Sequence, residues 1–97
     1  MERQRDVDAG FWERADSYID LANAHCEDAD AGKVSASLLF AASRFNAFVV
    51  ASNSSSQELL SQRKEEALEY FTEQFRLMLE ENLDDHIQNF SKYIERP

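Results

Sequence analysis

Residues 34–51 read VSASLLFAASRFNAFVVA and form the longest apolar region of the chain. The Ser and Ala side chains in this region are small enough to let neighbouring helices approach closely, while Leu, Phe and Val supply volume for a core. The segment is apolar on nearly every side of a helix, a pattern typical of a helix buried among others. We therefore predict a helix over about residues 34–52 that is the central, buried element of the fold.

The distribution of charge along the chain supports this prediction. The 97 residues carry a formal charge of −9, yet residues 33–57 contain no acid and only two bases, Lys33 and Arg44. Nine acids lie in residues 1–32 and ten in residues 58–97. Charged side chains are rarely buried without a partner, so the acid-free middle segment is expected to be interior.

A first amphipathic helix is predicted over about residues 8–29. Apolar residues fall on one stripe at 100° per residue, and Asp8 can cap the first turn through its carboxylate. Gly32 can adopt the left-handed conformation that often ends a helix. The stripe includes Phe11, Ala15, Tyr18, Ile19 and Ala22.

A third helix is predicted over about residues 56–82. Ser54 with Gln57 and Ser55 with Glu58 both have the spacing of a capping box. Beyond residue 82, a straight helix would rotate its apolar stripe by about 120°. We therefore expect a break near residues 82–84 and a short fourth helix over about residues 84–94, capped by Asp84.

Taken together, these elements predict an all-α fold. Three main helices, over about residues 8–29, 34–52 and 56–82, form an antiparallel bundle with the short helix over 84–94, because short loops favour antiparallel neighbours. Residues 1–97 are expected to form a single helical domain. Within it, residues 1–7 are expected to be a disordered or loosely held terminus.

Several kinds of chemistry lack their residues in this sequence. Gly10 and Gly32 are too far apart for a phosphate-binding loop, and one cysteine excludes an internal disulfide framework. The segment 28–33 resembles the start of a calcium loop but has its glycine fifth rather than sixth, and no acid follows at position twelve. The two histidines lie far apart. We expect no metal and no cofactor.

The net charge also bears on partners and location. A charge of −9 is repelled by nucleic-acid phosphates and by anionic lipid headgroups, so neither is expected to bind. Polar residues interrupt the apolar region 34–51, so we do not expect a membrane span there. A single cysteine agrees with a reducing compartment, and we predict a cytoplasmic protein.

Arg44 and Asn46 stand in the middle of the helix predicted to be buried. A buried guanidinium requires carboxylate or carbonyl partners, so one interpretation is a structural ion pair that aligns the helices. The other is a polar pocket between helices that binds a carboxylate, formed by Arg44, Asn46, Tyr18 and His25. In the structural interpretation, the candidate ion-pair partners of Arg44 are acids of the flanking helices: Asp16, Asp20, Glu69 and Glu73.

The third helix also carries a candidate interaction surface. Leu59, Tyr70 and Leu77 lie outside its main apolar stripe and share a second face, which either lines a dimer seam or packs on the terminal helix. Acids on the same helix, including Glu66 and Glu73, form either a docking surface for a basic partner or a solvated face.

Three segments together resemble a family of small, mainly proteobacterial proteins classified as a domain of unknown function. The resemblance covers about residues 10–94 and implies a compact helical cytoplasmic protein with no assigned activity. The segments are FWERAD at 11–16 followed by LAN at 21–23, the stretch 32–51, and YFTEQF at 70–75 through Asn89 and Phe90.

The sequence therefore favours a non-enzymatic protein–protein interaction module. Its partner is an unidentified protein or a second copy of the chain. The alternative is a small-ligand-binding or catalytic protein that uses the polar pocket around Arg44.

Overall fold

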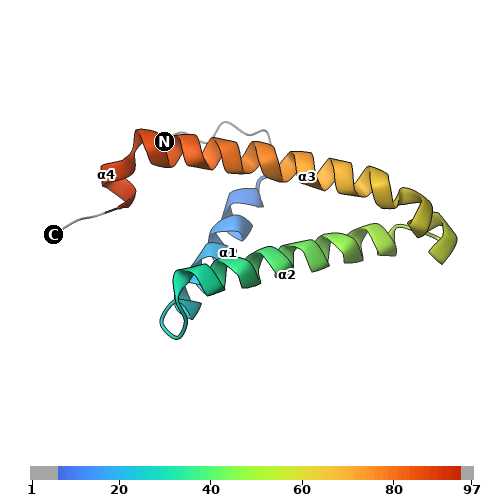
Figure 1. The fold of residues 1–97 in the computed structure, drawn as a ribbon, viewed down its shortest axis with the longest axis horizontal. Helices are drawn as coiled ribbons and strands as arrows, with labels where there is room; N and C mark the ends of the chain where they lie inside the picture. The colour runs from blue at the N-terminus through green and yellow to red at the C-terminus, as the bar shows by residue number, and fades with distance from the viewer. Residues whose placement is uncertain (1–6, 95–97) are drawn as a thin grey trace. The chain divides into compact units, whose positions relative to one another are not determined.

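All regular structure in the computed structural model, which describes residues 7–94, is helical. Four helices follow one another along the chain (Figure 1): α1 (Phe11–His25), α2 (Ala31–Ser52), α3 (Gln57–Gln88) and α4 (Phe90–Tyr93). No strand occurs within the described range. The all-α fold class predicted from the sequence is confirmed.

The described chain divides into two compact units, residues 7–53 and residues 54–94. The first unit contains α1 and α2, which contact each other, and the second contains α3 and α4, which also contact each other. The single domain predicted over 1–97 stays a prediction. The loosely held terminus predicted over 1–7 lies outside the described residues, apart from Val7.

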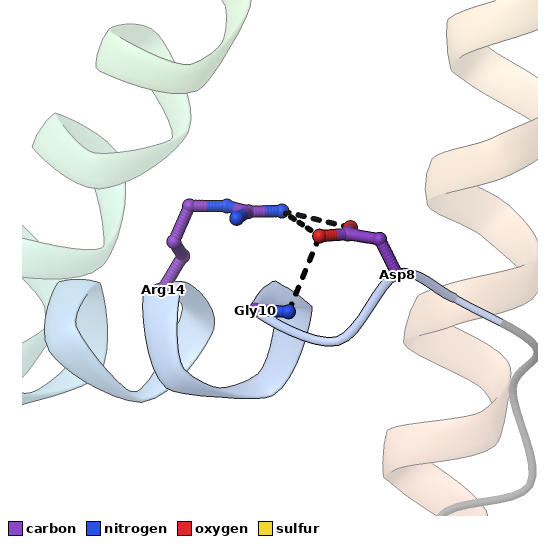
Figure 2. Close-up of polar contacts among 3 residues, drawn as sticks. All are labelled: Asp8, Gly10 and Arg14. Carbon is purple, nitrogen blue, oxygen red and sulfur yellow. Dashed lines mark hydrogen bonds and ion pairs between the residues drawn. The ribbon is translucent and has the colours of Figure 1, made fainter.

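The start of α1 differs from its prediction by three residues. Gly10, not Asp8, is the N-cap residue, and no side chain caps the helix. The Asp8 carboxylate instead accepts a hydrogen bond from the Gly10 backbone N–H at 3.2 Å and pairs with the Arg14 guanidinium at 2.8 Å (Figure 2). The bond from Arg14 lowers the pKa of Asp8. The carboxylate thus braces the turn before α1 rather than opening the helix itself.

The junction between α1 and α2 also corrects the prediction. Gly32 does not end α1, because it lies in the first turn of α2 and no glycine in the described residues has a positive φ. Asp30 is the N-cap of α2, and its carboxylate accepts from the Lys33 backbone N–H at 3.0 Å. A capping carboxylate this early lets α2 begin at Ala31, three residues before the predicted start.

The predicted burial of α2 in the centre of an antiparallel bundle is not confirmed. Within α2 only Val34 is buried, whereas Phe40, Phe45 and Phe48 are each more than 60% exposed. A helix that is apolar on every side needs neighbours on several sides. Its own unit supplies one helix, α1, and that contact leaves Val34 as the one buried residue of α2. The apolar pattern correctly identified the helix but did not identify what covers it.

Among the described helices, α2 is the one whose length and composition would allow it to cross a membrane. It has 22 residues and a mean hydropathy of 1.5 over an 18-residue window. A span requires about 20 mostly apolar residues, and core helices of non-membrane proteins meet the same criterion. The absence of a membrane span therefore stays a prediction.

In the second unit, α3 begins on a serine next to the two that were predicted to cap it. Ser56 is the N-cap residue, and its hydroxyl accepts from the Leu59 backbone N–H at 3.1 Å. Ser54 has a different role, because its hydroxyl accepts a hydrogen bond from the Arg63 guanidinium at 3.1 Å. The loop was identified correctly, while the choice among three adjacent serines was wrong.

The predicted break near residues 82–84 is absent, and α3 continues to Gln88. The Asn82 side chain donates to the Met78 carbonyl at 2.9 Å, and His86 Nδ1 lies 2.8 Å from the Asn82 carbonyl. Both contacts run along a continuous helix. The apolar stripe is free to rotate without a bend because Ile87 is 72% exposed. Only the turn α4 follows, in place of the predicted helix over 84–94.

Candidate functional site

The four residues of the predicted ligand pocket lie in the first unit. Tyr18 and His25 belong to α1, whereas Arg44 and Asn46 belong to α2. Tyr18, His25 and Arg44 are exposed and Asn46 is half-buried. No hydrogen bond or ion pair joins these four side chains in the part of the chain that the structure describes. The predicted pocket therefore stays a prediction.

Arg44 is exposed, so its charge does not need a buried partner. No ion pair involves its guanidinium within residues 7–94. Glu73, one of its candidate partners, instead bonds Arg76, three residues away on the same helix, at 3.0 and 3.1 Å. The structural ion pair predicted for Arg44 is therefore not seen, and α2 presents an unpaired cation on an apolar surface.

The surface around Arg44 is aromatic. Phe40 and Phe48 lie four residues before and after it and are 64% and 63% exposed. Residues four apart form a ridge along a helix, so Phe40, Arg44 and Phe48 make one continuous row, here called the α2 ridge. Phe45 lies beside the row, with its ring centroid 6.1 Å from that of Phe48.

The predicted interaction face of α3 is largely exposed. Tyr70 and Leu77 are 58% and 41% exposed, Glu66 and Glu73 are exposed, and Leu59 is half-buried. Glu66, Tyr70, Glu73 and Leu77 follow one another along α3 at successive spacings of four, three and four residues. This spacing keeps the four side chains on one side of the helix. We call these four residues the α3 seam.

The two carboxylates of the α3 seam have different surroundings. Glu73 accepts two hydrogen bonds from Arg76, and these bonds lower the pKa of Glu73 and raise that of Arg76. Arg76 also lies 4.0 Å from Glu80. Glu66 has no hydrogen bond or ion pair within the described range. Of the two acids in the seam, Glu66 is therefore the one available to a cation from another molecule.

Next to the seam, α3 has a shallow hollow that is open to solvent. Leu68, Glu69, Thr72 and Glu73 line it. All four residues come from α3, so the hollow is a groove between side chains of a single helix. Binding pockets usually bury most of a ligand and exclude water from it. An open groove of this kind does not.

A polar cluster at the end of α3 was not anticipated from the sequence. The Tyr93 hydroxyl donates to one oxygen of the buried Asp85 carboxylate at 2.7 Å, and Asn89 Nδ2 donates to the other at 2.8 Å. The His86 ring stacks on the Tyr93 ring with centroids 4.0 Å apart. These contacts hold α4 against α3. The spacing of Asp85, Asn89 and Tyr93, each four residues from the next, is the sequence signal that could have revealed the cluster.

The chemistry of this cluster is structural. The bond from Tyr93, followed by that from Asn89, lowers the pKa of Asp85, so the carboxylate is a weaker base than an ordinary aspartate. Both of its oxygens are occupied by donors from the same unit. A general base works best with a pKa near the working pH, and the lowered pKa of Asp85 moves it away from that range.

Residues that could hold a metal are not grouped in this structure. Within residues 7–94, no three or more His, Cys, Asp and Glu side chains lie close enough to share an ion. Cys26, at the C-cap of α1, is exposed and free. Two surfaces therefore remain as candidate sites. The α2 ridge combines aromatic side chains with a positive charge, and the α3 seam combines apolar side chains with negative charges.

Comparison with known proteins gives two matches. A family model described as "Protein of unknown function (DUF3144)" matches residues 11–87. The chain is also similar to the NMR structure of the protein NB7890A from Shewanella sp, with 31% sequence identity and a TM-score of 0.73 over 92% of this chain and 95% of that one. No curated protein matches. The resemblance predicted from the sequence is confirmed.

Proposed function

Because this chain belongs to the DUF3144 family, to which no activity is attached, we propose its function from its own surfaces: it is a non-enzymatic protein–protein interaction module that works through its helix faces. One observation carries the proposal. Each unit leaves large apolar side chains exposed on its helices, among them Phe40, Phe48, Tyr70 and Leu77.

Exposed apolar area on this scale has a physical consequence. Contiguous exposed apolar patches larger than a few hundred Å² are uncommon on proteins that act alone, and larger ones mark interaction sites. Three phenylalanines of α2, each more than 60% exposed, contribute roughly 300–500 Å² between them. Association with another protein surface would remove this area from water, at about 25 cal/mol per Å².

The surroundings of these faces favour a protein partner. The net charge of −9 opposes association with nucleic acid, and the single cysteine agrees with a reducing compartment such as the cytoplasm. Aromatic residues, including Phe, and Arg are enriched at protein–protein interfaces, and the α2 ridge contains both.

Photo-crosslinking tests this function directly. The photoreactive residue p-benzoylphenylalanine replaces Phe48 in the full chain, expressed in cells of its source organism. A matched variant places the same residue at Glu65, an exposed polar position of α3. We expect crosslinked protein products from position 48 and few from position 65. Position 48 yielding no protein product above the position-65 background would contradict the proposal.

A further inference from the structure

We propose that the partner of the α2 ridge is a second copy of this chain, and that the ridge of each copy docks on the α3 seam of the other. This inference rests on the proposed function and names the partner of the same surface. In the α2 ridge, two phenylalanines flank one unpaired cation, Arg44. In the α3 seam, Tyr70 and Leu77 alternate with two carboxylates, of which Glu66 is the unpaired one.

Charge argues against a second α2 helix as the cover of α2. Residues 31–52 contain no acid and two cations, Lys33 and Arg44. Two α2 helices crossing at their ridges would bring one Arg44 against the other, and like charges in contact destabilise an interface. A helix that carries carboxylates beside apolar side chains avoids this repulsion, and α3 is such a helix.

The residue spacing along the α2 ridge also matches the spacing along the α3 seam. Four residues, a rise of about 6 Å, separate Arg44 from each phenylalanine of the ridge, and four residues separate Glu66 from Tyr70. When Arg44 lies opposite Glu66, one ridge phenylalanine therefore lies beside the Tyr70 ring. Tyr70 is 58% exposed and has room for this contact. The small alanine and serine residues next to the ridge allow the two helices to approach closely.

The exposed apolar side chains supply part of the area that a dimer needs. A stable interface buries about 800 Å² on each partner. In a two-fold dimer each chain contributes both its ridge and its seam, so every contact occurs twice. The three α2 phenylalanines supply roughly 300–500 Å² per chain, and the exposed parts of Tyr70 and Leu77 add to it.

The test uses sedimentation velocity of the full chain over a wide concentration range. We expect the wild type to form dimers. Arg44→Glu and Glu66→Arg should each raise the dissociation constant by about tenfold or more, because each places like charges in contact. A chain that carries both Arg44→Glu and Glu66→Arg should recover most of the lost dimer affinity. Lys64→Glu and Glu65→Arg make the same charge changes on other sides of α3, and both should dimerise like the wild type.

Mixing the two single variants separates a contact between chains from one within a chain. A mixed dimer of Arg44→Glu and Glu66→Arg chains has one contact with the original charges and one with both charges exchanged. The mixture should therefore dimerise when neither variant does alone. Circular dichroism of each variant confirms that helix content is retained, and recovery in the mixture shows that both chains are folded.

Three results would overturn the inference. The first is a wild-type chain that stays monomeric at every concentration. The second is a dimer that neither charge variant weakens. The third is a monomer that binds vesicles of phosphatidylcholine and phosphatidylglycerol, which would assign α2 to a lipid surface. If the chain is monomeric but position 48 still crosslinks to a different protein, the interaction module stands and only the second copy is excluded.

Discussion

The carboxylate of Asp85 shows how much one residue holds in place. It accepts hydrogen bonds from Tyr93 and Asn89, and both bonds favour its charged form. Its pKa is lowered in the folded chain, chiefly by Tyr93. A lowered carboxyl pKa stabilises the fold above the pKa of the unfolded chain, about 3.9, and that contribution is lost as the pH falls through the folded value.

Replacing Tyr93 with Phe tests this residue. The loss of the hydroxyl should raise the pKa of Asp85 toward its ordinary value, and the α4 turn should detach from α3 at a higher pH than in the wild type. An NMR titration of the Asp85 carboxyl carbon measures the change. Ser91→Ala, a substitution at an exposed position of α4, is the control and should leave the titration unaltered. An unchanged Asp85 titration in Tyr93→Phe would show that the hydroxyl is not the cause.

Single residues were the least predictable part of this molecule. Arg44 was interpreted as buried because its neighbours are apolar, yet it is exposed. Asp85 was not singled out by the sequence analysis, yet it is buried. A residue's neighbours in the sequence define a helix face, but burial depends on what lies opposite that face. For Asp85 the opposite group is the Tyr93 hydroxyl, supplied by α4, which the sequence analysis had placed in one helix with Asp85 over residues 84–94.

At the scale of the helices, the start of α3 allows a comparison between adjacent serines. Ser56 caps the helix, so Ser56→Ala should lower the free energy of unfolding by about 1 kcal/mol. The Ser55 hydroxyl, one residue earlier, makes no hydrogen bond within residues 7–94. Ser55→Ala should therefore change the free energy of unfolding by far less. Urea unfolding of the full chain, followed by circular dichroism, compares the two. Equal losses from both substitutions would contradict the assigned cap.

The continuity of α3 gives a second prediction about a helix. If Asp84 capped a separate helix, its replacement by Ala would cost about 1 kcal/mol. In the interior of a continuous helix, the same replacement should be neutral or stabilising by up to about 0.7 kcal/mol, because alanine has the higher helix propensity. The unfolding free energy of Asp84→Ala decides between the two. A loss of the size expected for Ser56→Ala would indicate a break that the structure does not show.

Helix existence was predicted well and helix ends poorly. All three long helices were identified, because a period of 3.6 residues is a strong signal over a dozen residues or more. Their ends depend on which of several nearby polar groups makes the first hydrogen bond. Asp8, Ser54 and Ser55 were plausible caps, whereas Gly10 and Ser56 occupy the cap positions.

For the whole molecule, the proposed dimer predicts a thermal midpoint that depends on concentration. A hundredfold increase in chain concentration should raise the thermal midpoint by about 5–10 °C. The increase adds about 2.7 kcal/mol to the free energy of unfolding per dimer, which is shared by two chains. Differential scanning fluorimetry at several concentrations measures the shift. The Arg44→Glu chain should show a smaller shift over the same range. A midpoint independent of concentration in the wild type would be evidence for a monomer.

The fold class followed from the sequence, whereas the covering of α2 did not. Scarce glycine and proline and strong helical periodicity leave few alternatives to an all-α chain. An apolar helix shows only that its surface should leave water, and the sequence does not say which molecule provides the cover. The candidate surface was partly predicted in the same way. Tyr70 and Leu77 were singled out by their face, but the ridge at Phe40 and Phe48 was assigned to the core.

Cys26 makes this molecule convenient to measure. It is the chain's one cysteine, and its thiol is exposed in the turn that follows α1. A nitroxide attached there needs no substitution of any other residue. Electron–electron double resonance would then return one inter-label distance from a two-fold dimer and none from a monomer, in a chain whose sequence is otherwise unaltered.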